Sequence, residues 1–373
     1  MAFYRQTILL FVLVLIGGAI FYFESEKPMR ESSAEIREVP LMTLSPKESK
    51  SQIYDIGKEI TTPDGFINTD AITISELVGK KVVLVDFWTY SCINCQRTLP
   101  YLNDWYHKYS DKGLEIIGVH TPEFEFEKNY ENVAAAVKKF GIKYPVVLDN
   151  DFSTWTAYRN QYWPRKYLID IDGFIVYDHI GEGAYAQTEE KIQKALTERA
   201  QVLQGNGAVA AEVREIEIAP DQDLARAGSP EIYFGAWRNE YLANGERGII
   251  GEQELGAPAT LAPNSLYLDG KWNIQREYAE NASLNAKISF RYRAREVYFV
   301  AAADQLVRAR IFVDGKPLGT SAGEDIFVES GLSKVRIRDE RLYKLIRHKD
   351  YGEHQLDIII ENPGLKAFTF TFG

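Results

Sequence analysis

Cys92 and Cys95 are the only cysteines in a chain of 373 residues, and just two residues separate them. They come soon after Val82–Trp88 (VVLVDFW), a run that is apolar except for one aspartate and is typical of a buried strand. A helix that begins at the cysteines would place unpaired backbone N–H groups beside Cys92, which favours its thiolate form. Cys95 would lie one turn later, close enough to attack a mixed disulfide formed at Cys92. The pattern predicts a redox-active couple that needs no other cofactor.

A structural disulfide or half of a zinc site would explain the same spacing. Zinc would need further ligands, and the histidines of the chain are scattered without ligand-like spacing. A disulfide that closes so short a loop stabilises a fold only slightly, because it removes little chain entropy. We therefore expect no metal at this site.

Residues 85–95 (VDFWTYSCINC) resemble the active-site segment of the thioredoxin superfamily, which typically runs V-D-F-W-x-x-x-C-x-x-C. The resemblance implies that Asp86 is the buried carboxylate that relays a proton to and from the second cysteine, and burial would raise its pKa. The alternative is that Asp86 only satisfies local hydrogen bonds, although an isolated carboxylate is costly in so apolar a strand. Trp88 is expected to pack beside the site and border the substrate rather than take part in the chemistry.

In this superfamily a cis-proline precedes the next-to-last core strand and faces the cysteines. Pro164 fits that place, because residues 167–170 (YLID) follow it as a predicted strand. The resemblance implies that the backbone of Trp163 pairs with a bound peptide and that its ring shapes the groove. An ordinary trans proline at the start of a strand is the alternative.

Longer segments in both halves of the chain are also distinctive: residues 87–100 (FWTYSCINCQRTLP), 118–124 (GVHTPEF), 162–164 (YWP), 181–185 (GEGAY), 231–235 (EIYFG), 341–343 (RLY) and 370–373 (FTFG). They resemble DipZ-type proteins, in which a thioredoxin-like domain is followed by a β-sandwich similar to carbohydrate-binding modules. DipZ proteins usually begin with a multi-helix membrane domain that passes electrons outward, and a single apolar segment stands in its place here. The resemblance therefore implies a separate electron-donating membrane thiol reductase.

His120 and Glu123 lie where a predicted core strand ends, in the segment HTPEF. Open α/β sheets tend to place functional residues at the carboxyl ends of their strands. Both residues are therefore candidates for contact with the substrate, and His120 is also a candidate for tuning the thiols. A hydrogen bond that only stabilises the loop is the competing interpretation for His120.

Predicted strands and helices alternate along the chain around this site. After a short hairpin at residues 58–74, strands are expected at 82–88, 114–120, 145–149, 167–170 and 174–179, and helices at 98–109, 133–140, 153–158 and 188–203. The alternation predicts an α/β thioredoxin-like fold over residues 51–204, with a central mixed sheet flanked by helices.

A second domain with a different hydrophobic pattern is expected over residues 229–373, after a linker at 205–228. Its short alternating or β-branched runs, separated by turns such as Asp314-Gly315, predict an all-β jelly-roll sandwich similar to carbohydrate-binding modules. Several aromatic residues of this domain either form a platform for envelope glycan or belong to the core: Tyr233, Trp237, Tyr267 and Trp272.

Residues 1–23 are expected to form a single N-terminal transmembrane helix. The uncharged run at 8–23 (ILLFVLVLIGGAIFYF) approaches the length that crosses a bilayer, and Arg5 before it favours export of the remaining chain. The run ends in aromatic residues rather than the small residues of a cleavage site, so we expect an uncleaved anchor. Residues 24–50, polar and proline-containing, are predicted to be a stalk. These features predict a single-pass protein of the cytoplasmic membrane whose bulk is periplasmic in a bacterium.

The charge and the motifs together limit the possible functions of the chain. The net charge is −10 at pH 7, and no basic stripe supplies the electrostatic footprint that nucleic acid needs. We expect a thiol–disulfide oxidoreductase, and the resemblance implies that it reduces disulfides of exported proteins. A thiol peroxidase is one rival, because Thr89 precedes Cys92 as in peroxiredoxins, but Val85 stands where those enzymes carry proline. A glycan-binding envelope protein, in which the thioredoxin-like unit is incidental, is the other.

Overall fold

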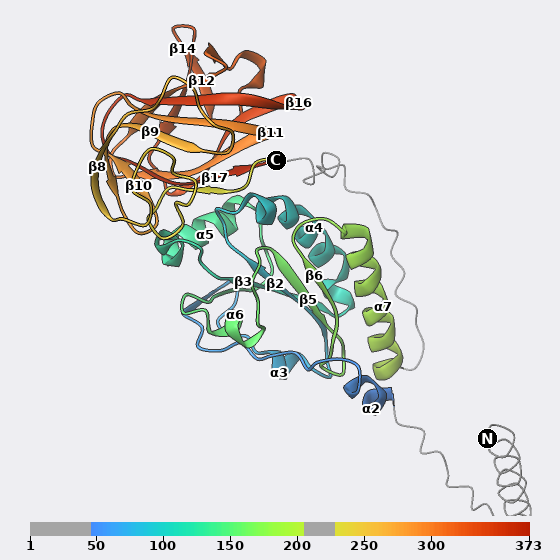
Figure 1. Ribbon diagram of the computed structural model, residues 1–373. Helices are drawn as coiled ribbons and strands as arrows, with labels where there is room; N and C mark the ends of the chain where they lie inside the picture. The colour runs from blue at the N-terminus through green and yellow to red at the C-terminus, as the bar shows by residue number, and fades with distance from the viewer. Residues whose placement is uncertain (1–45, 205–227) are drawn as a thin grey trace, which may run out of the picture. The chain divides into compact units, whose positions relative to one another are not determined.

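The computed structural model describes residues 46–204 and 228–373 of the chain (Figure 1). The predicted membrane anchor, the stalk up to residue 45 and the linker up to residue 227 lie outside the described residues. Within the two described ranges, no helix is both long and apolar enough to cross a bilayer. From Lys47 onward the described residues belong to one compact unit.

The first domain is built on a mixed six-stranded sheet with the strand order β1-β4-β3-β2-β5-β6. Strands β4, β3 and β2 run parallel, and the remaining strands are antiparallel to their neighbours. Strands β2 and β3 are buried along their whole length, as expected for apolar runs covered on both faces. The bounds are β1 (Gly65–Ile67), β2 (Val82–Trp88), β3 (Leu114–His120), β4 (Val146–Leu148), β5 (Arg165–Ile169) and β6 (Ile175–Ile180).

Helices cover both faces of this sheet (Figure 1). The face that carries Leu84 and Trp88 packs against α4, α5 and α7, and the face that carries Val83 and Phe87 packs against α3 and α6. Because side chains alternate along a strand, Asp86 points to the same side as α4. The bounds are α2 (Pro46–Ser51), α3 (Ile74–Leu77), α4 (Ile93–Tyr109), η1 (Ser110–Lys112), η2 (Glu125–Lys128), α5 (Tyr130–Lys139), α6 (Ser153–Ala157) and α7 (Tyr185–Gln204). This is the predicted α/β thioredoxin-like architecture.

The N-terminal part of the domain differs from the predicted hairpin at residues 58–74. Gly65 begins β1, which pairs with β4 at the edge of the sheet, and Ile74 begins α3 instead of ending a strand. The carboxylate of Glu59 accepts hydrogen bonds from the N–H groups of Ile74 and Ser75 at 2.7 and 3.0 Å. The hairpin prediction was wrong because this segment is held by a contact at the start of a helix, which local propensity does not reveal.

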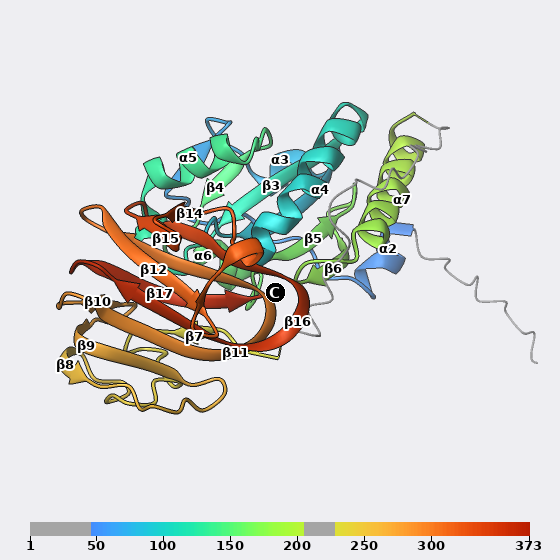
Figure 2. The same cartoon turned by 90° about the horizontal axis from the view of Figure 1, so that it is seen from above.

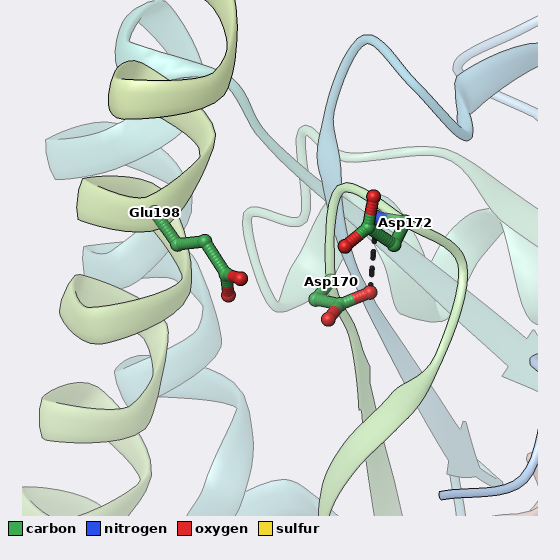
Figure 3. Close-up of side chains that lie close together, drawn as sticks. All are labelled: Asp170, Asp172 and Glu198. Atoms are coloured by element: carbon green, nitrogen blue, oxygen red, sulfur yellow. Dashed lines mark hydrogen bonds between the residues drawn. The ribbon is translucent and has the colours of Figure 1, made fainter. Parts of the chain in front are cut away.

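Helix α2 lies inside the segment predicted to be a stalk, so the folded domain begins earlier than residue 51. The ammonium group of Lys50 forms ion pairs with Asp170, Asp172 and Glu198 at 2.5, 2.9 and 2.6 Å. These carboxylates, from the turn after β5 and from α7, converge on one point (Figure 3). The acidic cluster therefore already holds a cation, which is the lysine of α2.

The second domain is all β, as predicted, but its strands form one eleven-stranded sheet rather than the two sheets of a jelly roll. The first part of β11 pairs with β9 and its second part pairs with β17, so β9, β10, β17 and β11 close into a barrel-like ring. The bounds are β7 (Ile232–Tyr233), β8 (Gly251–Leu255), β9 (Leu266–Ile274), β10 (Ala279–Asn281), β11 (Ala286–Ala303), β12 (Val307–Val313), β13 (Lys316–Pro317), η4 (Gly319–Ser321), β14 (Ile326–Glu329), β15 (Leu332–Ile337), β16 (Arg341–Ile360) and β17 (Leu365–Phe372).

Two long strands explain this difference from the prediction. Strands β11 and β16 pair along most of their length and curve together through the domain (Figure 2). Register shifts interrupt the pairing between Ala294 and Glu296 and between Val297 and Tyr298. A bulge bends a strand without ending it, so residues 286–303 form one long strand where the sequence predicted short separate runs.

The second part of β11 lies between two cores. Val297 and Phe299 belong to the core of the second domain, whereas Tyr298 and Val300 pack into the core of the first domain. Both faces of the strand are therefore buried from Val297 onward, although they are contributed to different domains.

Strand β17 makes a second hydrophobic contact with the first domain. The ring of Phe368 lies 5.2 Å from that of Phe124 and 4.9 Å from that of Phe126, centroid to centroid. Phe368 is 3% exposed. The interface is therefore built like a protein core.

Candidate active site

Cys92 and Cys95 lie at the start of α4, as the sequence predicts. Cys92 is the N-cap residue, and its sulfur accepts a hydrogen bond from the N–H of Cys95 at 3.4 Å. The structure holds both residues as free thiols, with Cys92 partly exposed and Cys95 buried. The exposed sulfur can meet a disulfide of another protein, and the buried sulfur is reached through Cys92.

Burial raises the pKa of the Cys95 thiol well above its ordinary value. The hydrogen bond and charge of Cys92 raise it further, as does the charge of Asp86, while the backbone of Thr89 opposes them. Cys95 is therefore a protonated thiol that needs a base before it can act as a nucleophile.

Asp86 is 1% exposed on the face of β2 that looks toward α4. Burial raises its pKa from 3.8 to about 6, although the charge of Lys166 opposes the shift. A carboxyl group with such a pKa can exchange protons near neutral pH. The geometry is compatible with the proton relay that the resemblance implies, and the relay itself stays a prediction.

Lys166 belongs to this site, and sequence reasoning missed it. It lies in β5 directly opposite Asp86, and its Nζ is 3.7 Å from Oδ1 of Asp86, with both side chains almost fully buried. Neither of these two atoms has a hydrogen-bond partner in the part of the chain that the structure describes. Burial lowers the pKa of Lys166, and the charges of Asp86 and Cys95 oppose this. The available signal was a charged residue in a core strand just after Pro164.

Trp88 packs beside the site, as expected, but it is fully buried and does not border a substrate. A Cβ atom at Gly118 would lie 3.0 Å from its indole nitrogen and 3.1 Å from the ring of Tyr144, so the glycine makes room for both rings. Burial, followed by the charges of Asp86 and Cys95, raises the pKa of Tyr144. The expected substrate contact was wrong, because the side chains packed on this face of the sheet cover the indole.

His120 is fully buried at the end of β3. Its Nε2 accepts a hydrogen bond from the N–H of Tyr90 at 3.3 Å, and the ring of Tyr90 stacks on it. Burial lowers the pKa of His120 to about 3, so the imidazole is neutral at physiological pH. The geometry supports the interpretation that His120 stabilises the loop rather than contacts a substrate.

Glu123 is engaged with the second domain rather than with open solvent. One of its oxygens accepts hydrogen bonds from the hydroxyl of Tyr233 and the guanidinium of Arg238, each at 2.8 Å. Arg238 also stacks on Tyr233, with 3.7 Å between the guanidinium carbon and the ring centroid. Glu123 therefore fastens the loop after β3 to the second domain, and the predicted substrate contact is not what this geometry provides.

Glu127, which the sequence analysis did not single out, is fully buried in the same loop. Its Oε1 accepts hydrogen bonds from the N–H and the hydroxyl of Ser91 at 3.2 and 2.6 Å. Its Oε2 accepts hydrogen bonds from the N–H groups of Glu123 and Phe124 at 2.6 and 3.0 Å. Burial raises the pKa of Glu127 to about 7, although these hydrogen bonds oppose the shift. Because Glu127 stands in the charged run EFEK, its sequence context is typical of a solvated turn.

The peptide bond between Trp163 and Pro164 is cis, as predicted. The indole N–H of Trp163 donates to the carbonyl of Thr121 at 3.0 Å, and its ring lies 4.3 Å from that of Trp155. Trp163 lines a cavity of about 170 Å³, whose walls include Trp237 and other residues of the second domain. Binding of a peptide at Trp163 and Pro164 stays a prediction.

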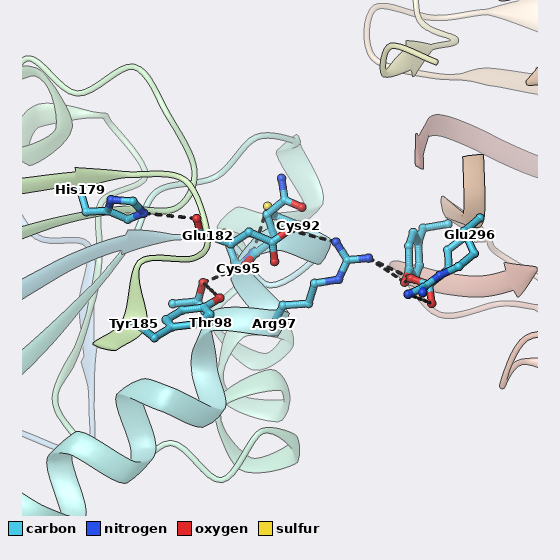
Figure 4. A network of polar contacts seen from close by, with 11 residues as sticks. Cys92, Cys95, Arg97, Thr98, His179, Glu182, Tyr185 and Glu296 are labelled. Atoms are coloured by element: carbon cyan, nitrogen blue, oxygen red, sulfur yellow. Dashed lines mark hydrogen bonds and ion pairs between the residues drawn. The ribbon is translucent and has the colours of Figure 1, made fainter. Parts of the chain in front are cut away.

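Arg97 joins the helix of the cysteines to both domains (Figure 4). Its guanidinium forms ion pairs with Glu182 at 3.1 Å and with Glu296 at 3.0 Å, and it donates to the hydroxyl of Tyr298 at 3.0 Å. Glu296 is 3% exposed. This partly buried network fixes the start of α4 against β11, and its partners are too distant in sequence to be predicted.

The four aromatic residues considered for a sugar platform do not share an exposed face. Trp272 and Tyr267 are buried, and Tyr233 is held by Glu123. Trp237 is 65% exposed. The interpretation as core residues is therefore correct for Trp272 and Tyr267, and the four residues do not form a shared exposed platform.

Comparison with known proteins gives matches in both domains. Residues 55–178 match the AhpC/TSA family, and residues 229–373 match the domain described as thioredoxin like C-terminal domain. Thiol-disulfide oxidoreductase ResA of Bacillus cereus is 37% identical over 144 residues, which are 37% of this chain and 78% of ResA. The chain belongs to the thioredoxin-like thiol–disulfide oxidoreductases.

The comparison also finds other similar proteins. Thiol-disulfide oxidoreductase YkuV of Bacillus subtilis is 27% identical over 140 residues, covering 38% of this chain and 93% of YkuV. Protein DipZ of Mycobacterium tuberculosis is 35% identical over 321 residues, or 84% of this chain, and the chain spans 43% of the length of DipZ. The solution structure of a thioredoxin-like protein in the oxidized form aligns with a TM-score of 0.37 and 26% identity, over 39% of this chain and 97% of that one.

Proposed function

We propose that this oxidoreductase is anchored in the cytoplasmic membrane of a bacterium by residues 1–23 and reduces disulfides of exported proteins outside the cytoplasm. The observation that carries the reaction is the pairing of a partly exposed Cys92 with a buried Cys95 beside the buried carboxyl group of Asp86. The apolar run at residues 8–23 and the similarity to DipZ over both domains support the location. The couple itself is the only redox cofactor that this reaction needs.

The reaction moves two electrons from the dithiol to a client disulfide. The thiolate of Cys92 attacks one client sulfur, forms a mixed disulfide and releases the other client sulfur as a thiolate. Asp86 accepts the proton of Cys95, whose sulfur then attacks the sulfur of Cys92. The client leaves as a dithiol, and a Cys92–Cys95 disulfide remains. A separate membrane thiol reductase must return two electrons before the next cycle.

A redox titration of residues 46–373 against glutathione and dithiothreitol tests this proposal. We expect one reversible couple near the thioredoxin value of about −270 mV, and a value near about −120 mV would reverse the direction of transfer. Cys95→Ala should trap mixed disulfides with exported proteins, and Cys92→Ser should trap none. Protease added to intact spheroplasts should digest the second domain if the chain is exported.

The match of residues 55–178 to the AhpC/TSA family keeps a thiol peroxidase as the second candidate. A peroxidase would consume hydrogen peroxide in the presence of a dithiol, with a rate that depends on Cys92. We expect the wild-type protein to consume peroxide no faster than Cys92→Ser. A large rate that depends on Cys92 would replace the reductase proposal with the peroxidase.

A further inference from the structure

The short segment between β2 and α4 determines where the sulfur of Cys92 lies. Thr89, Tyr90 and Ser91 connect the end of the strand to the N-cap of the helix. Within the segment, the N–H of Cys92 donates to the carbonyl of Thr89 at 3.4 Å, and the side chain of Gln96 donates to the carbonyl of Tyr90 at 2.8 Å. These contacts do not involve the side chain of Ser91, the immediate neighbour of Cys92.

Ser91 is held by Glu127. It uses one oxygen for the N–H and hydroxyl of Ser91 and the other oxygen for the N–H groups of Glu123 and Phe124. One carboxylate therefore joins the segment before Cys92 to the loop after β3. Ser91 has two groups that can donate a hydrogen bond, its N–H and its hydroxyl, and both donate to Glu127. Glu127 is therefore the side chain that connects Ser91 to the loop after β3.

A buried carboxylate at this position lowers the stability of the fold more than a neutral side chain would. Glu127 is fully buried, and within residues 46–204 and 228–373 it has no ion pair with lysine, arginine or histidine. A buried charge without a countercharge is destabilising, and neutral side chains can join two loops at lower cost. A carboxylate offers two oxygens that accept from several donors at once, and four donors meet it here.

We propose that Glu127 is a positioning residue for the Cys92–Cys95 couple, because it fixes Ser91 and so keeps the sulfur of Cys92 at the N-terminus of α4. There the sulfur accepts the N–H of Cys95, and it lies where the helix N-terminus favours a thiolate. When Glu127 is lost, Cys92 moves out of this arrangement and its thiolate becomes less reactive. The inference rests on the proposed function of the couple and adds the residue that holds the couple in place.

The test measures the rate of alkylation of Cys92 by iodoacetamide in the full chain, together with the reduction potential of the couple. Ser91→Ala removes one of the four hydrogen bonds and should slow alkylation by about fivefold. Glu127→Gln cannot accept from both loops and should slow it by about tenfold. The double variant should be no slower than Glu127→Gln alone, because both changes remove the same interaction. Glu125→Gln, at an exposed position of the same short helix, should match the wild type.

Two outcomes would overturn the inference. If Glu127→Gln and Ser91→Ala lower the melting temperature but leave the alkylation rate and the potential unchanged, Glu127 supports the fold alone. If the effects of the two substitutions multiply, the residues act independently. Should Glu127→Gln not fold, Ser91→Ala alone decides, and an unchanged rate in that variant overturns the inference. A wild-type protein without a reversible Cys92–Cys95 couple would instead refute the proposed function. The comparison of alkylation rates does not depend on that function.

Discussion

Asp86, Lys166 and Cys95 share the buried space between the central sheet and α4. Moving a charge into such a space is costly, and this cost raises the pKa of Asp86 and lowers that of Lys166. Their separation of 3.7 Å lets each charge offset part of the cost of the other. The result is a carboxyl group that changes its protonation state near neutral pH, next to a thiol that must lose a proton.

Asp86→Asn should slow the attack of Cys95 on the mixed disulfide by about ten- to hundredfold at pH 7, because asparagine cannot accept the proton. In the wild type, this rate should rise with pH through about 6, where Asp86 loses its own proton. The rise should be absent from the variant. Stopped-flow measurement of client release across pH 5 to 8 checks both statements. A variant with the wild-type rate and pH profile would exclude Asp86 from the relay.

Lys166→Met should shift the midpoint of the same pH profile upward by about one unit, since a nearby cation normally favours the carboxylate. The sign follows from the charge of Lys166, which holds the pKa of Asp86 below the value that burial alone would give. Arg165→Met is the matched control, because its guanidinium pairs with Asp178 instead. A midpoint that stays at about 6 in Lys166→Met would show that the ion pair does not tune Asp86.

Among the elements, α2 is tied to the rest of the first domain by Lys50. Lys50 meets three carboxylates from the turn after β5 and from α7, and these hydrogen bonds raise its pKa despite its partial burial. Because its folded-state pKa lies above the ordinary value of 10.5, the stabilisation is complete at neutral pH and is lost only as the pH rises above about 10. The ion pairs of Lys50 therefore stabilise the domain throughout the physiological pH range.

Lys50→Ala should lower the free energy of unfolding by about 2 kcal/mol, because Asp170 is buried and loses its counterion. Lys47→Ala, on the exposed side of the same helix, should change it by less than about 0.5 kcal/mol. Chemical denaturation of residues 46–373 provides the comparison. Equal stabilities for the two variants would mean that α2 contributes nothing to the domain.

The elements differ in how far local sequence determines them. Strand β3 was predicted with its observed bounds, because an apolar run is cut off sharply by Gly113 and Thr121. Helix α4 begins at Ile93, beside the cysteines as the C-x-x-C motif implies, whereas the hydrophobic pattern alone indicated a helix only from Thr98, because a cysteine N-cap is not a common start signal. The long bulged strand β11 was not predicted, because arginines and a glutamate interrupt its hydrophobic pattern.

The site shows the same limit. Cys92 and Cys95 were predicted from their spacing, and Asp86 and the cis bond at Pro164 from the resemblance to the thioredoxin superfamily. Glu127 and Lys166 were not, although they contact the same site. Their roles depend on which strands and loops become neighbours after folding, and single-sequence patterns carry little of that information.

In the molecule as a whole, the second domain contacts the active-site helix and the loop after β3 directly. Arg97 reaches Glu296 from the first, and Glu123 meets Arg238 from the second. A domain that only bound a ligand elsewhere would not need contacts at these positions. We therefore expect the two domains to unfold together.

Phe368→Ala should destabilise the whole chain by about 3 kcal/mol, because it leaves a cavity between the domains beside Phe124 and Phe126. Val328→Ala changes a residue that is 68% exposed and should have an effect below about 0.5 kcal/mol. Calorimetry should show one transition for the wild type and a lower midpoint for Phe368→Ala. Two separate wild-type transitions would show that the domains are independent.

Strand β11 limits how the two domains can diverge in evolution. In its first part, Lys287, Arg291 and Arg293 are at least partly exposed between buried positions, so these three residues can change with little effect on either core. From Val297 to Ala303 both faces are covered, one by each domain, so neither set of positions can drift alone. A substitution on either face of this part of β11 changes how the strand packs against the core of one domain. Residues 297–303 should therefore covary with both cores across related chains, and a lineage that exchanged its second domain would have had to replace this strand with it.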